Sequence, residues 1–225
     1  MRCGLLYHWG MLNKIYERHK LHWPDVRLAL GSLASLAIFL FAIFVIQPLA
    51  IDFANESATS PVGDIILSNT PVFDVGIFFV YGMFLLVLFI GVLCLSHPNR
   101  IPFVLHSLTL FVLIRCVFVS LTHVGAFSTQ AASDFGPAIT RMFFGADHFF
   151  SGHAGAPFLM ALIFWHYPSL RYTFLAWSVF FSTVVLLGHL HYSIDVLAAF
   201  FITYGIFHVA RWLLPRDWAL FNRAG

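Results

Sequence analysis

The sequence predicts an all-α protein, a polytopic membrane bundle of six transmembrane helices with both termini in the cytoplasm. The first observation is composition, because 60% of the 225 residues are hydrophobic and only 10% are charged. A soluble domain of this length has too small an interior to bury that much apolar surface. The second is that the apolar residues form six separate runs, each near the about 20 residues that cross a bilayer as a helix. The third is that the basic residues gather on one side of such a bundle.

Three regions follow in chain order. Residues 1–27 form a cytoplasmic, interfacial segment, because Trp9, Tyr16 and Trp23 stand in an otherwise mixed and polar stretch. Residues 28–213 form the membrane domain, with spans at 28–50, 72–95, 102–124, 149–167, 172–190 and 192–213. Residues 214–225 form a cytoplasmic tail. The first apolar run is long enough to cross the bilayer, so we expect a span there and not a cleavable signal peptide.

Polar, turn-rich segments separate these spans. The connection at 55–71 is rich in turn residues, and the connection at 125–147 is a longer polar loop. Residues 96–100 and 167–171 each contain a proline, and we expect both to be tight loops.

The basic residues predict the orientation. Of the 12 Lys and Arg residues, ten lie on the side of the termini: Arg2, Lys14, Arg18, Lys20, Arg27, Arg100, Arg171, Arg211, Arg216 and Arg223. Only Arg115 and Arg141 do not, and most acidic residues lie near the opposite face. Because cytoplasmic loops carry the excess of Lys and Arg, the termini are expected in the cytoplasm. Ser151-Gly152-His153 and His191 then lie at the non-cytoplasmic face.

His191 and Asp195 are the first candidate catalytic pair. They are four residues apart, so we expect them to share one face of the sixth helix. A carboxylate there can hold one N–H of the imidazole, fix its tautomer and stabilise positive charge. The other ring nitrogen is then available to attack phosphorus. The alternative is a His–Asp pair that only satisfies itself inside the bundle.

Ser151-Gly152-His153 is the second candidate motif, at the start of the fourth span. Free backbone N–H groups and the helix dipole favour a phosphate at such a position, and glycine permits its close approach. His153 can then protonate a departing oxygen as a general acid. The alternative is that Ser151 is a plain N-cap and His153 an interfacial side chain.

Three charged residues are expected to support the site. Arg115 lies inside the third span, where an unpaired guanidinium is costly, and a phosphate is its natural bidentate partner. The alternative is that Arg115 pairs with Asp74, Asp147 or Asp195 and so holds helices together. Asp147 is expected to orient His153 or to hold Arg141, and Asp74 to cap a helix or shape the site. We treat His123, His148 and His189 as lining or interfacial residues.

These motifs resemble the sphingomyelin synthase family, a branch of the type 2 phosphatidic acid phosphatase superfamily, over roughly residues 70–211. The strongest elements are Gly145-Ala146-Asp147-x-x-x-Ser151-Gly152-His153-Ala154 and His191-Tyr192-Ser193-Ile194-Asp195-Val196, with Ala199, Thr203 and Phe207 at the later spacing. Looser matches are Arg115-Cys116 followed by Thr122, and Pro71-Val72-Phe73-Asp74.

The resemblance implies an enzyme that transfers a phospholipid head group through a histidine-bound intermediate, with release of diacylglycerol and without a metal or other cofactor. The donor would be phosphatidylcholine or phosphatidylethanolamine, and the acceptor ceramide, diacylglycerol or water. Carried over by position, His191 is the nucleophile, Asp195 its partner and His153 the acid–base. The active site would face the lumen or the exterior. The compact loops favour a bacterial inner membrane with a site that faces the periplasm, and an endomembrane with a luminal site is compatible with the sequence.

The chain departs from the family pattern around these motifs. Gly145, Ala146 and Ala154 replace Cys, Gly and Thr, Ile114 replaces a Tyr, and Ala210-Arg211 replaces Tyr-His. These changes leave the acceptor and the head group open. The ordinary lipid phosphatases of the superfamily carry Ser-Arg before the second histidine, where this chain has Val184 and Val185.

Three other functions stay open. A lipid phosphate phosphatase would release inorganic phosphate from phosphatidic acid. A haem- or metal-binding bundle would use some of the 12 histidines, although no pair of mid-membrane ligands on facing helices is evident. A third is an inactive scaffold. The net charge of +2 does not indicate a nucleic-acid partner, and the three scattered cysteines indicate neither a disulfide framework nor a zinc site.

Overall fold

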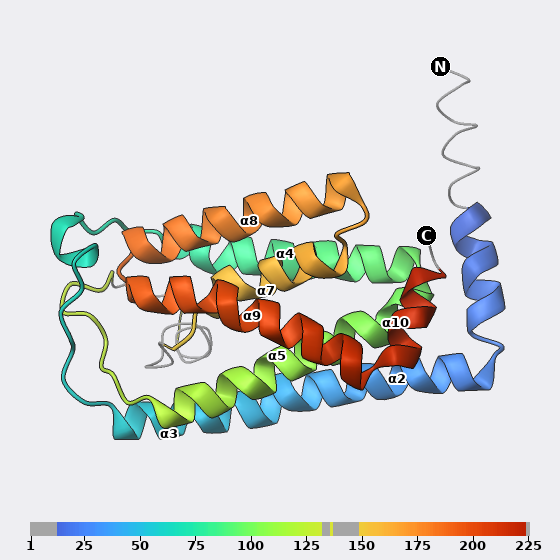
Figure 1. Cartoon of the computed structure of the whole chain (residues 1–225), viewed down its shortest axis with the longest axis horizontal. Coiled ribbons are helices and arrows are strands. Elements are labelled where there is room, and N and C mark those ends of the chain that lie inside the picture. Colours follow the sequence, from blue (N-terminus) through green and yellow to red (C-terminus); the bar gives the residue numbers. More distant parts are fainter. Residues whose placement is uncertain (1–12, 132–135, 137–148, 224–225) are drawn as a thin grey trace, which may run out of the picture.

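The computed structural model describes residues 13–131, 136 and 149–223, whose regular elements are all helices, with no strand among them (Figure 1). Its elements are α2 (Val26–Phe41), η1 (Ala42–Ile46), α3 (Gln47–Ser57), η2 (Leu67–Asn69), α4 (Gly76–Ser96), η3 (Pro98–Arg100), α5 (Ile101–Leu121), α7 (Gly152–Ile163), α8 (Pro168–Leu187), α9 (Ser193–Leu213) and α10 (Pro215–Asn222). A further helical stretch covers residues 13–22.

Five helical stretches of the described residues are long and apolar enough to cross a membrane: Val26–Ser57, Gly76–Ser96, Pro98–Leu121, Pro168–Leu187 and Ser193–Leu213. The first joins α2, η1 and α3 without a break, the middle part being a π-helical turn. Pro48 stands in the first turn of α3, and the helix continues through it. These five helices support a polytopic integral membrane protein, as the composition predicted.

The expected fourth span, 149–167, is realised only in part. Its helix, α7, has 12 residues, which rise about 18 Å and do not reach across about 30 Å of hydrocarbon. Ser151 caps the helix at its N-terminus, and the described residues directly before it, 149 and 150, are not helical. After Ile163 the chain turns, and Pro168 starts the next helix. The six full spans of the prediction are therefore not confirmed.

A second difference from the expected boundaries is that α8 starts earlier than predicted. The predicted tight loop at 167–171 is wrong, because Tyr167 is the N-cap of α8 and Pro168 is already in its first turn. Proline suits this position because its missing N–H would have no helical partner there. Pro102 in α5 and Pro215 in α10 occupy the same kind of position.

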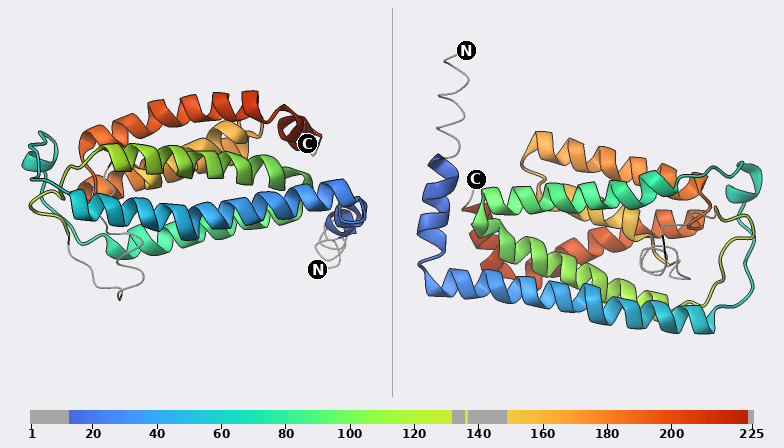
Figure 2. Two further views of the ribbon diagram at one scale, coloured as in Figure 1. Left: turned by 90° about the horizontal axis from the view of Figure 1, so that it is seen from below. Right: turned by 180° about the vertical axis from the view of Figure 1, so that it is seen from behind.

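The short helix α7 lies at the centre of the bundle. It packs against α8, α9, α5 and α4, and Figure 1 shows it beginning partway along the bundle while α8 and α9 extend further. Most of its residues are buried, from His153 to Ile163. The long first helix runs along α5 on the other side (Figure 2). The start of α7 is therefore recessed within the bundle.

The helical stretch 13–22 lies across one end of the bundle, the end that also holds α10 (Figures 1 and 2). The buried ring of His22 fastens it there, with Nδ1 2.8 Å from Asn99 Oδ1 and Nε2 2.9 Å from Ser32 Oγ. The basic residues Arg100 of η3, Arg171 near the start of α8 and Arg211 in the last turn of α9 lie at this same end. That this end faces the cytoplasm stays a prediction.

Candidate active site

The N-terminus of α7 is the first component of the site. Ser151 is the N-cap, and its Oγ accepts a hydrogen bond from the Ala154 backbone N–H at 3.4 Å. Ser151 is buried, so this capping bond forms away from water. The alternative interpretation of Ser151 as an N-cap is therefore correct, and it is compatible with a phosphate site because other N–H groups of the first turn point the same way.

A backbone hydrogen bond joins this N-terminus to the second motif. The Ser151 N–H donates to the Asp195 carbonyl oxygen at 3.2 Å. The two segments are remote in sequence, and α7 and α9 pack against each other along their length. The structure therefore brings the two predicted motifs together at one place in the bundle.

His191 and Asp195 approach each other, but not on one helix face as expected. His191 precedes α9, and Tyr192 is its N-cap. The Asp195 Oδ2 accepts a hydrogen bond from the Tyr192 backbone N–H at 2.9 Å and lies 3.6 Å from His191 Nδ1. The prediction that the two residues share one helix face is thus wrong, because His191 lies before the helix begins. Their contact arises instead from the capping arrangement at the start of α9. Both side chains are buried, with 6% of the His191 side chain and 4% of the Asp195 side chain exposed.

His153 lies inside the bundle in the first turn of α7. Its ring stacks on Phe79 of α4, with centroids 3.8 Å apart, and meets the edge of Phe181 of α8 at 5.4 Å. Arg115 packs against Gly152, the residue directly before His153. His153 is therefore a buried side chain and not an interfacial one.

Arg115 approaches the same N-terminus from α5. Its Nε–H donates to the Phe150 carbonyl oxygen at 2.9 Å, and 8% of the residue is exposed. A Cβ at position 152 would lie 3.2 Å from Arg115 Nε, so Gly152 allows the guanidinium to pack directly against the start of α7. Arg115 therefore lies against the first of the two motifs, Ser151-Gly152-His153.

Of the other predicted residues, Asp74 lies at the start of α4. Asp74 is exposed, and its Oδ1 accepts a hydrogen bond from the Gly76 backbone N–H at 3.2 Å at the start of α4, which is the capping role among the two expected. Asp147 lies outside the described residues, as does His148. His123 contacts Phe53 of α3 at 5.7 Å between ring centroids.

Asp64 is a residue of this region that the sequence did not single out. Its Oδ2 accepts hydrogen bonds from the backbone N–H and the Oγ–H of Ser193 at 2.7 and 2.8 Å. Its Oδ1 accepts from the backbone N–H groups of Ile66 and Leu67 at 2.9 and 3.1 Å. Burial raises the pKa of Asp64, but these hydrogen bonds outweigh it and hold the pKa below the usual 3.8.

Asp64 thereby fastens the loop between α3 and α4 over the start of α9. Tyr192 adds to this attachment, since its hydroxyl donates to the Gly125 carbonyl oxygen at 2.8 Å and accepts from the Val62 N–H at 3.3 Å. The residues just before and inside the first turn of α9 are thus held by two loops. Only a three-dimensional structure reveals this, because Asp64 and Ser193 are 129 residues apart.

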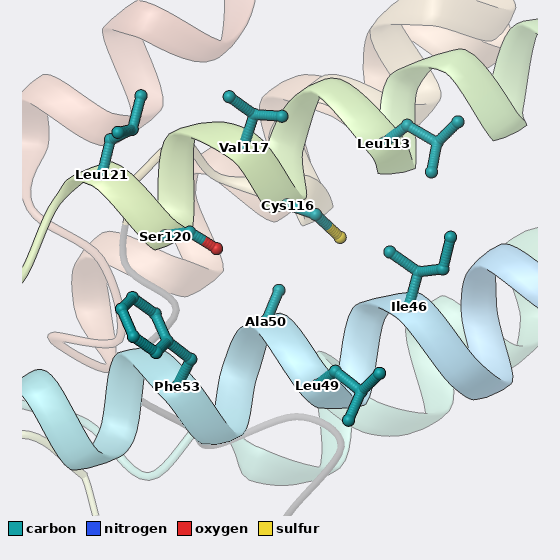
Figure 3. Close-up of a pocket in the computed structure, with 9 residues that line it drawn as sticks. All are labelled: Ile46, Leu49, Ala50, Phe53, Leu113, Cys116, Val117, Ser120 and Leu121. Atoms are coloured by element: carbon teal, nitrogen blue, oxygen red, sulfur yellow. The ribbon is translucent and has the colours of Figure 1, made fainter.

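An apolar groove lies on the other side of α5 (Figure 3). It has a volume of about 530 Å³ and is formed between η1 and α3 on one side and α5 on the other, with the lining residues Ile46, Leu49, Ala50, Phe53, Leu113, Cys116, Val117, Ser120 and Leu121. Arg115 turns towards α7, while its neighbour Cys116 lines the groove. The groove is therefore separate from the histidine motifs.

Among the described residues, no group of three or more His, Cys, Asp or Glu side chains is arranged to hold a metal ion. The polar groups that do converge are a His–Asp pair, a second histidine, an arginine and a helix N-terminus. Such a set suits a reaction at a phosphoryl group, because it offers a nucleophile, an acid–base and donors for anionic oxygens.

Comparison with known proteins agrees with this class of site. The family model described as PAP2 superfamily C-terminal matches residues 145–212, which contain both histidine motifs. The match supports the type 2 phosphatidic acid phosphatase superfamily, whose members are generally phosphatases or phosphotransferases acting on lipids, and does not distinguish the sphingomyelin synthase branch. No curated protein and no solved structure matches the chain.

Proposed function

We propose that the protein is a phospholipid head-group phosphotransferase that uses a covalent intermediate on His191. The donor is phosphatidylcholine or phosphatidylethanolamine, and the acceptor is a lipid hydroxyl, that of ceramide or diacylglycerol, or water. The observation that carries the proposal is the hydrogen bond between Ser151 N–H and Asp195 O, because it joins the two histidine motifs into one site.

In the first half-reaction, His191 attacks phosphorus. Its Nδ1 faces Asp195 at 3.6 Å, so Nε2 forms the new N–P bond as the P–O bond to diacylglycerol breaks. His153 donates a proton to the departing oxygen. Arg115 and the N–H groups at the start of α7 hold the non-bridging oxygens, which carry the negative charge.

In the second half-reaction, the roles reverse. His153, now neutral, takes the proton from the acceptor hydroxyl, whose oxygen attacks phosphorus as the N–P bond breaks. A lipid acceptor gives head-group transfer, and water gives a phospholipase C-like hydrolysis. Burial of the histidines supports transfer, because a site that excludes water disfavours the competing hydrolysis.

The test is an assay of purified protein in vesicles that contain phosphatidylcholine or phosphatidylethanolamine labelled in the head group, with and without ceramide. We expect the label to move to ceramide, with His191→Ala reducing the rate to background. His166→Ala, at an exposed histidine between α7 and α8, is the matched control and retains the activity of the original chain. Full turnover by His191→Ala would exclude the covalent mechanism.

A lipid phosphate phosphatase is the second candidate, and the superfamily match supports it equally. It predicts release of inorganic phosphate from phosphatidic acid and no movement of a head group. The same preparation assayed with phosphatidic acid distinguishes the two functions. We place the site on the non-cytoplasmic side, from the distribution of basic residues.

A further inference from the structure

His189 ends α8 in a backbone conformation that few residues with a side chain adopt. Its φ is +53°, in the left-handed region that costs an L-residue free energy and that glycine occupies without strain. The His189 N–H donates to Leu186 O at 3.1 Å and the Leu190 N–H to Val185 O at 2.9 Å. These two bonds form a Schellman motif, in which glycine is the usual residue at this position. A histidine here is therefore strained, which directs attention to its side chain.

The side chain of His189 is buried and makes one specific hydrogen bond. Only 2% of the residue is exposed. Nδ1 lies 2.7 Å from Thr129 Oγ1, and the edge of the ring meets Phe127, with centroids 5.4 Å apart. The imidazole therefore connects the turn between α8 and α9 to the segment that follows α5.

That segment, residues 125–131, is here called the strap. Alternate residues of the strap contact the turn that carries His191: Gly125 O accepts from the Tyr192 hydroxyl at 2.8 Å, Phe127 meets the rings of His189 and Tyr192, Thr129 bonds His189, and the Ala131 N–H donates to Gly188 O at 2.9 Å. His191 lies between these points of attachment. Its backbone is therefore held on both sides.

We propose that His189 is a positioning residue, which acts through Thr129 and the strap to set the direction of the His191 imidazole. The inference rests on the proposed function, since it concerns the nucleophile of that reaction. His191 precedes α9 and gains no orientation from a regular helix. A shift of about 1 Å in a reacting group can cost about 100-fold in rate. A turn that holds His191 in one position therefore favours the reaction.

The experiment compares four variants in the head-group assay. Thr129→Val and His189→Gly remove the hydrogen bond, Thr129→Ser keeps it, and His189→Asn keeps a polar side chain that tolerates positive φ. We expect the first two to lower kcat about 10- to 100-fold with KM within about 2-fold, and the last two to retain most of the activity. Because glycine relieves the strain, His189→Gly should keep or raise the Tm while it loses kcat. The double variant Thr129→Val with His189→Gly should be no slower than the slower single variant.

A second readout needs no substrate. In protein labelled with ¹⁵N-histidine and dissolved in detergent, the His191 ring signals are assigned by their absence from His191→Ala. We expect Thr129→Val and His189→Gly to shift these signals and Thr129→Ser to leave them in place. If His191→Ala retains turnover, the proposed function fails, yet the shift still supports the positioning. The positioning role would be overturned if His189→Gly left both kcat and the His191 signals unchanged. It would also be overturned if kcat fell only in variants whose Tm fell to the same extent.

Discussion

The carboxylate of Asp195 contacts both the start of a helix and a histidine. One oxygen, Oδ2, accepts from the Tyr192 N–H at 2.9 Å and lies 3.6 Å from His191 Nδ1. The cap fixes the carboxylate, and the carboxylate in turn favours the His191 tautomer that has its proton on Nδ1. A single buried side chain thus serves both the fold and the proposed chemistry, and the two contributions can be separated by mutation.

Asp195→Asn separates them. The amide oxygen still accepts from the Tyr192 N–H, so the start of α9 should be kept, with a Tm close to that of the original chain. The neutral amide no longer stabilises a positive imidazole, so we expect kcat to fall by about 10²- to 10⁴-fold. Assays and thermal unfolding of the same preparation measure both effects. Full kcat in this variant would show that the carboxylate has only its capping role.

At the scale of the element, α7 depends on a close approach to its neighbours. A Cβ at position 155 would lie 2.8 Å from the Phe111 ring of α5 and 2.8 Å from Thr203 Oγ1 of α9. Both neighbours are buried, so neither has free space to move into. Gly155 therefore lets α7 fit between α5 and α9.

Gly155→Ala should consequently separate these helices. We expect a loss of stability of about 1 to 3 kcal/mol from overpacking, seen as a lower Tm in detergent, together with lower activity. Gly205→Ala in α9 is the matched control, because a Cβ there meets nothing within 4 Å and alanine favours a helix. Equal Tm values for the two variants would contradict the packing argument.

The loop between α3 and α4 is the second element whose attachment can be tested. Its anchor is the ionised Asp64, whose pKa the bonds from Ser193, Leu67 and Ile66 hold below 3.8 against the effect of burial. A lowered pKa means that the carboxylate stabilises the folded state above about pH 3.8, and that this contribution is lost as the pH falls through the pKa of the folded state.

Asp64→Asn should therefore lower stability at neutral pH, by about 1.5 to 3 kcal/mol for hydrogen bonds to a charged group. The difference in Tm from the original chain should shrink as the pH falls below 3.8. Ser193→Ala, which keeps the backbone N–H donor and loses only the hydroxyl, should show a smaller difference. A Tm difference that stays constant from pH 6 to pH 3 would show that the ionised carboxylate of Asp64 is not the anchor of this loop.

At the scale of the whole molecule, hydropathy predicted most of the architecture. It is a local property, so the five long apolar helices could be located from the sequence. The limits of α7 could not, because its ends depend on the cap at Ser151 and the turn before Pro168. Polarity within apolar runs also identified Arg115 and the two histidine motifs, since such residues need a reason to be there.

The contacts that loops make with the start of α9 were beyond the reach of the sequence. Asp64 meets Ser193 across 129 residues, and no local pattern pairs the two. The left-handed residue at the end of α8 is His189 and not the glycine before it. A sequence pattern would assign that conformation to Gly188, which is one residue too early. The nearness of His191 to Asp195 was anticipated, but a capping turn produces it and not a helical face.

The length of the first helix has a consequence for access to the site. Val26–Ser57 has 32 residues, which rise about 48 Å and still about 37 Å when tilted by about 40°. This exceeds a hydrocarbon thickness of about 30 Å, so a helix of this length would extend beyond the hydrocarbon of a bilayer. The loop that leaves its C-terminal end is bound through Asp64 to the start of α9, close to the turn that carries His191. Under the proposed function, a phospholipid diffusing within its own leaflet would reach the histidines from the side, beneath this loop, without leaving the bilayer.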